Sequence, residues 1–188
     1  MKKLCFIDTE TTGTDPQKHG LIQLAGFIVI DGEEKETFNY RVQPFVGDAV
    51  EDSALAVNKT TREEISTYSA PRTVYLDFAS LLSKYVDKYD KRDKFFFIGY
   101  NTRFDADFVR AFFEKNGDGY FGSWFWFPPI DVMNLAAVEL MEERESLQNF
   151  KLATVAYTLK IQANGELHDA LTDIRLTQKL YNSLTSGE

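Results

Sequence analysis

The sequence of 188 residues has few of the features that cross-link a protein or anchor it in a membrane. Its one cysteine, Cys5, has no partner within the chain, which excludes an internal disulfide and suits a reducing compartment. The longest uncharged apolar run, Leu21 to Ile30, is about half the length of a membrane-spanning helix. The apolar run after Met1-Lys2-Lys3 stops at Asp8, too early for a signal peptide. We therefore expect a soluble, cytoplasmic protein with no membrane partner.

Positive charge is also scarce. The chain has 21 Lys and Arg against 29 Asp and Glu, which gives a net charge of −8. Proteins that follow long stretches of nucleic-acid backbone carry basic grooves, because phosphate neutralisation supplies much of their affinity. Any nucleic-acid activity here must use a small footprint, with bound cations beside the phosphate. The same acidity favours a rival interpretation, a protein-interaction module that makes no nucleic-acid contact.

The first part of the chain predicts three strands. The length is that of one domain, and no repeat or linker divides it, so we expect residues 1–188 to form a single domain. Leu4 to Ile7 has the pattern of a buried central strand, and Leu21 to Ile30 that of a second. Asp31-Gly32 is a hairpin signal that leads to a third strand at Thr37 to Val42. Together these segments predict an antiparallel meander.

The later part of the chain has mainly helical periodicity. Thr61 and Glu64 form a capping box, which predicts a short helix. The remaining predicted elements are a helix over Val74 to Tyr89, a strand over Phe95 to Ile98, and helices over Phe104 to Lys115, from Asp131, over Leu152 to Leu159 and over Asp169 to Leu184. Three strands followed by alternating helices and strands predict an α/β fold with a mixed sheet.

The first unusual acidic segment is Asp8-Thr9-Glu10. Because side chains alternate along a strand, Asp8 and Glu10 share the face of Leu4 and Phe6, which a central strand would bury. Neighbouring carboxylates repel unless a cation joins them, and oxygen ligands suit Mg²⁺ or Mn²⁺. An acid-x-acid triplet is common, however, and on its own it favours the interpretation as a solvated strand end or turn cap.

The second acidic segment leads into a predicted helix. Asp105 lies with Phe108 and Phe112 on the apolar face of that helix, whereas Asp107 lies with Arg110 on the polar face. This placement favours an inward role for Asp105. A helix N-cap is an equally good interpretation of this segment alone, since Asp is a preferred capping residue.

The third acidic segment opens the last predicted helix. Asp173 falls within the inward stripe that also contains Ala170 and Thr177, and a buried carboxylate requires a partner or a metal. His168 lies about 140° from Asp173 on an ideal helix, so it must precede the helix to reach the same site, with Asp169 as the cap. His19, by contrast, is interpreted as a surface residue or a hydrogen-bonded core residue.

The three segments together resemble the motifs of the DEDD exonuclease superfamily over nearly the whole chain. Asp8-x-Glu10 matches the first motif, Asn101-x-x-Phe104-Asp105 the second, and His168-x-Ala170-x-x-Asp173 the third. A histidine in the third motif makes the chain similar to the DEDDh branch, which contains proofreading exonucleases like the epsilon subunit of DNA polymerase III, and ribonuclease T.

The resemblance implies a fold, a cofactor and a reaction. The fold would be ribonuclease H-like, a mixed sheet flanked by helices. Two divalent ions, Mg²⁺ or Mn²⁺, would bind to four carboxylates. Asp8, Glu10 and Asp173 would ligate one ion, and Asp8 would bridge to a second ion held by Asp105 directly or through water. With His168 as general base, the chain would remove nucleoside 5′-monophosphates from the 3′ ends of single-stranded DNA or RNA.

The resemblance also nominates residues that hold the terminal nucleotide, namely Thr11, Thr12, Asn101 and Phe104. The threonines and the asparagine have an alternative interpretation as turn or cap residues. Three departures from the family pattern, Asn58, Tyr100 and Arg103, leave the substrate preference open. The positions of Lys59, Arg62, Arg103 and Lys151 make them candidates for phosphate contacts, although they could be ordinary surface charges.

Two features allow other roles. The aromatic segment from Tyr120 to Phe127 could stack on unpaired bases, although a loop packed over the core or a partner interface is slightly favoured. The whole chain could be a catalytically silent relative that acts as a binding module, or a proofreading partner of a polymerase. Silent relatives are expected to have lost a ligand or the base, whereas all five residues are present here.

Overall fold

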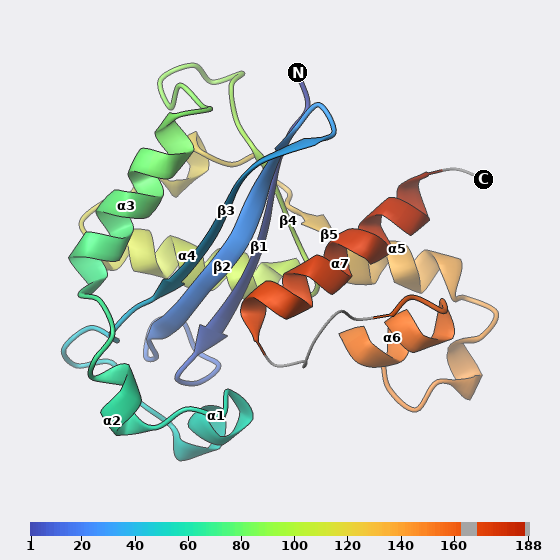
Figure 1. Cartoon of the computed structure of the whole chain (residues 1–188), viewed down its shortest axis with the longest axis horizontal. Coiled ribbons are helices and arrows are strands. Elements are labelled where there is room, and N and C mark those ends of the chain that lie inside the picture. The colour runs from blue at the N-terminus through green and yellow to red at the C-terminus, as the bar shows by residue number, and fades with distance from the viewer. Residues whose placement is uncertain (163–168, 187–188) are drawn as a thin grey trace.

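A central mixed sheet organises the molecule in the computed structural model, which describes residues 1–162 and 169–186 (Figure 1). The strand order is β3-β2-β1-β4-β5. The strands span Lys3–Thr11 (β1), Leu21–Ile30 (β2), Glu33–Arg41 (β3), Phe96–Gly99 (β4) and Ile130–Asp131 (β5). The pairs β1–β2 and β2–β3 are antiparallel, whereas β1–β4 and β4–β5 are parallel. The predicted meander and mixed sheet are confirmed.

The β2–β3 hairpin closes at the predicted turn. Asp31 and Gly32 both have positive φ, of 50° and 88°, as a two-residue turn of this twist requires. β3 begins at Glu33, four residues before the predicted start, because the tight turn starts pairing at once. A bulge between Ile28 and Val29 then shifts the register by one residue. This shift decides which side chain of β3 lies level with the end of β1, across the intervening strand β2.

Helices cover both faces of the sheet (Figure 1). On one face lie α3 (Pro71–Ser83) and α4 (Thr102–Lys115), and on the other lie α5 (Val132–Glu139), α6 (Leu152–Thr158) and α7 (Ala170–Thr185). β1 contributes to both cores by alternation. Cys5 and Ile7 pack with the α3–α4 core, and Leu4 and Phe6 pack with the core under α5, α6 and α7.

The smaller elements differ most from expectation. Thr61 caps α2 (Arg62–Ile65) as predicted, its hydroxyl accepting from the Glu64 N–H at 3.1 Å. The helix predicted to reach Tyr89 ends at Ser83, and Tyr89 is exposed. α1 (Asp52–Val57), β5 and the 3₁₀ turns η1 (Phe121–Ser123) and η2 (Arg144–Ser146) were not predicted, since each is too short to show a period.

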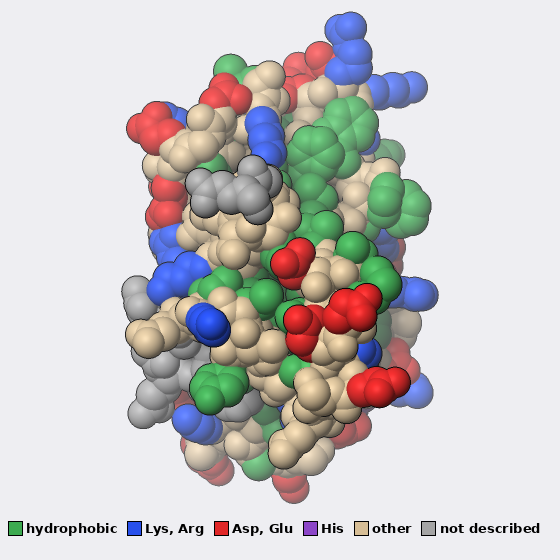
Figure 2. All heavy atoms as spheres, turned by 90° about the vertical axis from the view of Figure 1, so that its right-hand side faces the viewer, with side chains coloured by type: hydrophobic (Ala, Val, Ile, Leu, Met, Phe, Trp, Pro, Cys, Tyr) green, Lys and Arg blue, Asp and Glu red, His purple; other side chains and the backbone are tan. Residues whose placement is uncertain are grey.

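The surface carries charges of both signs. On the face turned towards the viewer in Figure 2, Lys and Arg side chains are scattered among Asp and Glu and do not form a continuous basic track. Within residues 1–162 and 169–186, no helix is both long and apolar enough to cross a membrane.

Candidate active site

Asp8 and Glu10 lie inside β1 and not in a turn beyond it. Asp8 is paired with Ala25 and Glu10 with Gln23 on β2, and both acids are half-buried. They share the face of β1 that packs under α7, as alternation along the strand predicted. The interpretation of this triplet as a turn is therefore wrong, and its acids lie near the end of the strand.

Asp105 reaches β1 from the opposite face of the sheet. It is 3% exposed, and its Oδ1 accepts hydrogen bonds from the Thr9 N–H at 3.0 Å and the Thr9 hydroxyl at 2.8 Å. α4 begins at Thr102, two residues earlier than predicted, and Asn101 occupies the N-cap position. The N-cap interpretation of Asp105 is therefore wrong, and the inward orientation is confirmed.

Asp173 comes from the first turn of α7. The helix packs against β1 and β2, with Ala170, Ile174 and Thr177 buried around Asp173. Asp169 caps the helix as predicted, its Oδ1 accepting from the Thr172 N–H at 3.2 Å. His168 lies outside the described residues.

Burial, and then nearby negative charge, raises the pKa of these acids. Burial raises the pKa of Glu10 to about 8, and the charges of Asp173 and Asp105 add to the effect. Burial likewise raises the pKa of Asp105 to about 7. The pKa of Asp8 is raised well above its ordinary value by burial and then by the charges of Asp105, Glu10 and Asp173. Acids from β1, α4 and α7 therefore lie where their ionised form is disfavoured, and a bound cation would favour that form.

The donor set fits divalent ions in the type of its ligand atoms. Carboxylate oxygens are the ligands that Mg²⁺ and Mn²⁺ prefer. Among residues 1–162 and 169–186, no group of three or more acidic, histidine or cysteine side chains already has the spacing of a formed metal cluster. Binding would therefore have to draw the carboxylates closer together, which their mutual repulsion opposes until a cation is present.

The two threonines after the first motif have hydroxyls engaged in the following turn. The Thr11 hydroxyl donates to the Gly13 carbonyl at 2.7 Å. The Thr12 hydroxyl donates to the Ala49 carbonyl at 2.6 Å and accepts from the Gly20 N–H at 2.8 Å. Asn58, one of the departures from the family pattern, donates to the Thr11 carbonyl at 2.9 Å. Asn58 therefore borders the same end of β1 as the acids.

The second-motif residues lie at the start of α4. Asn101 has φ of 60° and is exposed, and its N–H donates to Asp131 Oδ1 at 3.0 Å. Phe104 is half-buried, with its ring centroid 4.8 Å from that of Phe108. The preceding Tyr100 points elsewhere, since its hydroxyl donates to the Phe150 carbonyl at 2.7 Å.

One row of side chains beside the acids was missed by the sequence analysis. Gln23 lies opposite Glu10 and Arg41 lies opposite Gln23, so the three residues stand abreast across β1, β2 and β3. Asp169 Oδ2 accepts from Gln23 Nε2 at 3.3 Å and from Arg41 Nη2 at 3.4 Å. The Arg41 charge lowers the pKa of Glu10, opposing the acids around it. No motif marks Arg41, and strand register alone brings it here.

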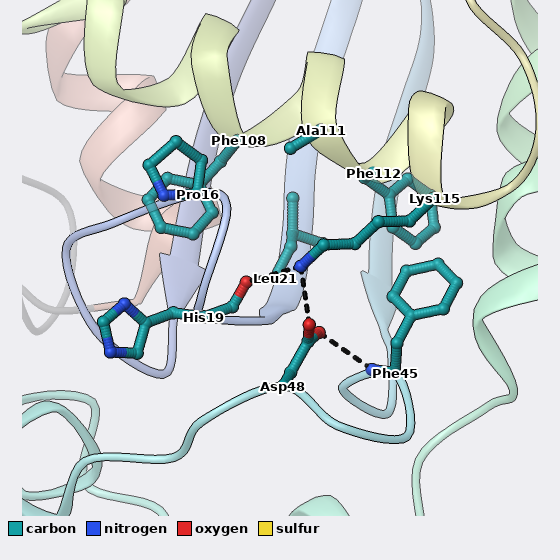
Figure 3. A pocket seen from close by; sticks show the side chains of 9 residues that line it. All are labelled: Pro16, His19, Leu21, Phe45, Asp48, Phe108, Ala111, Phe112 and Lys115. Atoms are coloured by element: carbon teal, nitrogen blue, oxygen red, sulfur yellow. Dashed lines mark hydrogen bonds and ion pairs between the residues drawn. The ribbon is translucent and has the colours of Figure 1, made fainter.

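His19 is structural, as interpreted from the sequence. It is 7% exposed, the Asp15 N–H donates to its Nδ1 at 3.0 Å, and its Nε2 lies 3.0 Å from Glu51 Oε1. Figure 3 shows the small pocket beside it, where the Lys115 ammonium donates to the His19 carbonyl at 3.0 Å and to Asp48 at 2.6 Å. These bonds fasten the turn after β1 and the segment after β3 to α4.

The candidate phosphate-binding cations have different surroundings. Arg62 donates to Asp52 at 2.7 Å and to the Val50 carbonyl at 2.6 Å, so it is bound within the α1–α2 region. Arg103 is exposed and pairs with Asp107 on the same helix at 3.7 Å. Lys151 is exposed at the N-cap of α6, and Lys59 follows α1 with φ of 51°.

A mixed five-stranded sheet with acids from β1, α4 and α7 at one end is the ribonuclease H-like architecture of a nuclease. A sequence model of the family described as exonuclease matches residues 5–181. The chain therefore belongs to the exonuclease family, within the DEDD superfamily. A comparison with curated protein sequences gave no match.

Solved structures of exonuclease I share the fold. E. coli exonuclease I in complex with a dT13 oligonucleotide has a TM-score of 0.80 and 20% identity, over 99% of this chain and 41% of that chain. An apo form of exonuclease I has a TM-score of 0.79 and 19% identity, over 100% of this chain and 43% of that chain. The zinc-bound complex of the E. coli enzyme with single-stranded DNA has a TM-score of 0.78 and 22% identity, over 99% of this chain and 41% of that chain. This chain thus spans about two fifths of those chains.

Proposed function

We propose that this chain hydrolyses single-stranded nucleic acid from the 3′ end and releases nucleoside 5′-monophosphates. The observation that carries the proposal is the convergence of Asp8, Glu10, Asp105 and Asp173 from three elements, where the pKa values of Asp8, Glu10 and Asp105 are raised. Structural ion pairs perturb pKa values too, but they bring opposite charges together, whereas here like charges gather at the end of a buried strand. Membership of the exonuclease family supports the same conclusion.

Two divalent ions, Mg²⁺ or Mn²⁺, would complete this site. Asp8, Glu10 and Asp173 would hold one ion, and Asp8 with Asp105 would hold the second. The ions would lower the pKa of a water and stabilise the charge on the leaving 3′ oxygen. The Thr9 hydrogen bonds fix the Asp105 carboxylate, so this ligand would be oriented before metal binds.

The chain's own residues would position the strand and move the proton. His168 would accept the proton of the attacking water as that water's oxygen bonds to phosphorus and the 3′ oxygen leaves. Thr11, Thr12, Asn101 and Phe104 would hold the terminal nucleotide, Thr12 through its backbone because its hydroxyl is engaged in the turn. Arg41, beside Glu10 and Asp169, would offset negative charge when phosphate enters.

Digestion of 5′-labelled single-stranded DNA and RNA oligonucleotides, with Mg²⁺ or Mn²⁺ and with EDTA as the blank, tests the proposal. We expect a ladder that shortens from the 3′ end, is absent in EDTA, and is lost in the Asp8→Asn and His168→Ala variants. Faster degradation of the DNA or of the RNA oligonucleotide would identify the sugar that the site prefers. If neither strand shortens although metal binding is confirmed, the chain is a silent binding module and the proposal fails.

A further inference from the structure

A groove of about 800 Å³ runs along the outer face of α4, at the β5 edge of the sheet. One wall is α4. The other is the segment 121–131, which contains most of the aromatic segment and ends with β5. We call it the α4 groove. Its charged and aromatic lining includes Lys94, Arg103, Asp107, Arg110, Trp126 and Phe127.

The α4 groove starts beside the second motif. Asp131 lines the groove and accepts the hydrogen bond from the Asn101 N–H. Arg103, also in the lining, is two residues from Asp105, so the same turn of α4 faces the acids on one side and the groove on the other. A strand whose terminal nucleotide lies beside Asp105 can therefore leave the active site along this groove.

The charge of the groove differs from that of the whole chain. Although the chain has a net charge of −8, three cations line the groove against Asp107 and Asp131. The side chain of Arg103 is 91% exposed, and its pairing with Asp107 at 3.7 Å is of the weak, solvent-screened kind. Arg103 and Arg110 stand about 10 Å apart along the helix axis, so they can contact successive parts of one backbone.

Aromatic rings line the same groove as the cations. Phe127 is 87% exposed, although Phe121, Trp124 and Phe125 of the same segment are buried in the core. Trp126 is half-buried, and its ring lies 5.4 Å from the Lys94 ammonium. Cations and accessible rings along one groove are the combination that binds single strands, through phosphates and stacked bases respectively.

We propose that the α4 groove binds the nucleotides that precede the 3′ end of a single strand. Arg103 and Arg110 would contact phosphates, and Trp126 and Phe127 would stack on bases. The inference rests on the proposed function, since it takes the 3′ end to lie at the acids. Charge complementarity favours nucleic acid over a protein partner. The aromatic segment is then divided, with its buried rings in the core and its last two rings on the substrate.

A length series of single-stranded substrates tests the groove. We expect the Arg103→Gln/Arg110→Gln double variant to raise KM about tenfold on a 12-mer but much less on a trinucleotide, because a trinucleotide reaches only the start of the groove. Affinity for a single strand falls as salt rises, and the slope of log affinity against log salt concentration should become shallower by about 1.4 when two phosphate contacts are lost. Phe127→Ala should weaken 12-mer binding about fivefold through loss of one stacked base.

The matched control removes the same charge elsewhere. Lys35→Gln/Lys84→Gln takes two cations from the β3 side of the sheet, where they pair with Glu33 and Glu36, and should not change KM on either substrate. An equal effect of the two double variants would show a general charge effect and overturn the proposal. A change of self-association with Phe127→Ala in analytical ultracentrifugation, at unchanged strand affinity, would make the groove a protein interface instead.

Photocross-linking separates failure of the groove from failure of the proposed function. A 12-mer with 5-iodouracil at single positions upstream of the 3′ end is irradiated on the Asp8→Asn protein, which should not cleave. We expect cross-links to the peptide that contains Trp126 and Phe127. If the wild-type protein cleaves but upstream cross-links map elsewhere, the groove proposal is wrong and the proposed function stands. If no strand is cleaved, the cross-linked peptide still decides whether the groove binds nucleic acid.

Discussion

The two faces of α4 carry acidic residues in different ways. On the inner face, Asp105 is buried and oriented by two hydrogen bonds from Thr9. On the outer face, Glu114 is exposed and Asp107 has its neighbour Arg103 within reach. A buried carboxylate is costly unless it is paired, whereas an exposed one is nearly neutral for stability. The difference predicts that the charge of Asp105 matters for function and that the charge of Glu114 does not.

The largest expected effect comes from removing the carboxylate charge on the inner face of α4. Asp105→Asn keeps the shape of the side chain but removes the charge of a proposed metal ligand, so we expect kcat to fall by roughly 1,000-fold. Glu114→Gln, the matched change on the outer face, should change kcat by less than about twofold. Single-turnover cleavage of a labelled oligonucleotide measures both. Equal effects of the two variants would show that burial does not distinguish the faces of α4.

A smaller loss is expected when the base is removed and the acids are kept. General-base catalysis typically contributes about 100-fold or more, so His168→Ala should lower kcat by at least that factor. The acids remain, so binding of Mn²⁺, followed by calorimetry, should be close to that of the wild type. Reduced metal affinity in this variant would make His168 a ligand and not the base.

The orientation of the acids could be predicted from periodicity. Alternation along β1 placed Asp8 and Glu10 with Leu4 and Phe6, and the helical stripe placed Asp173 inward. Both arguments need nothing beyond the segment itself, because the period of the backbone fixes the direction of each side chain. The same reasoning failed for the ends of short elements, where too few residues repeat.

The position of Arg41 could not be predicted from the sequence. Without the bulge at Ile28 and Val29, the two-residue turn would pair Gln23 with Tyr40, and Arg41 would face away from the site. The bulge shifts β3 by one residue and brings Arg41 beside Asp169. β5 was not predicted for a similar reason. It has only two residues and is held through its pairing with β4, so no local sequence pattern indicates a strand there.

Metal binding should stabilise the protein through the inner acids. At a metal concentration of 100 Kd the gain is about 2.7 kcal/mol, which for a chain of this length raises Tm by roughly 5–10 °C. Asp173→Ala should lose most of this response, and Glu114→Gln should keep it. Differential scanning fluorimetry with Mg²⁺, Mn²⁺ and EDTA measures the shift. An unchanged response in Asp173→Ala would remove that residue from the ligand set.

The last expected effect is on the metal-free protein, where the inner acids should make stability fall with rising pH. The folded-state pKa values of Asp105 and Glu10, about 7 and about 8, lie above the ordinary values that the unfolded chain would have. Between about pH 4 and pH 8 the folded state therefore binds more protons than the unfolded state, and the free energy of unfolding decreases as pH rises. Thermal unfolding in EDTA across this range measures the slope.

Asp105→Asn gives this pH prediction its sharpest form. The amide oxygen can still accept both Thr9 hydrogen bonds, but it carries no charge at any pH in this range. In EDTA at pH 8 the variant should therefore melt at a higher temperature than the wild type, although it should be nearly inactive with metal. Glu114→Gln, which alters an exposed acid, should follow the wild-type curve. If Asp105→Asn instead melts lower than the wild type at pH 8, the buried charge is already compensated in the folded protein, and the contrast between the two faces of α4 does not hold.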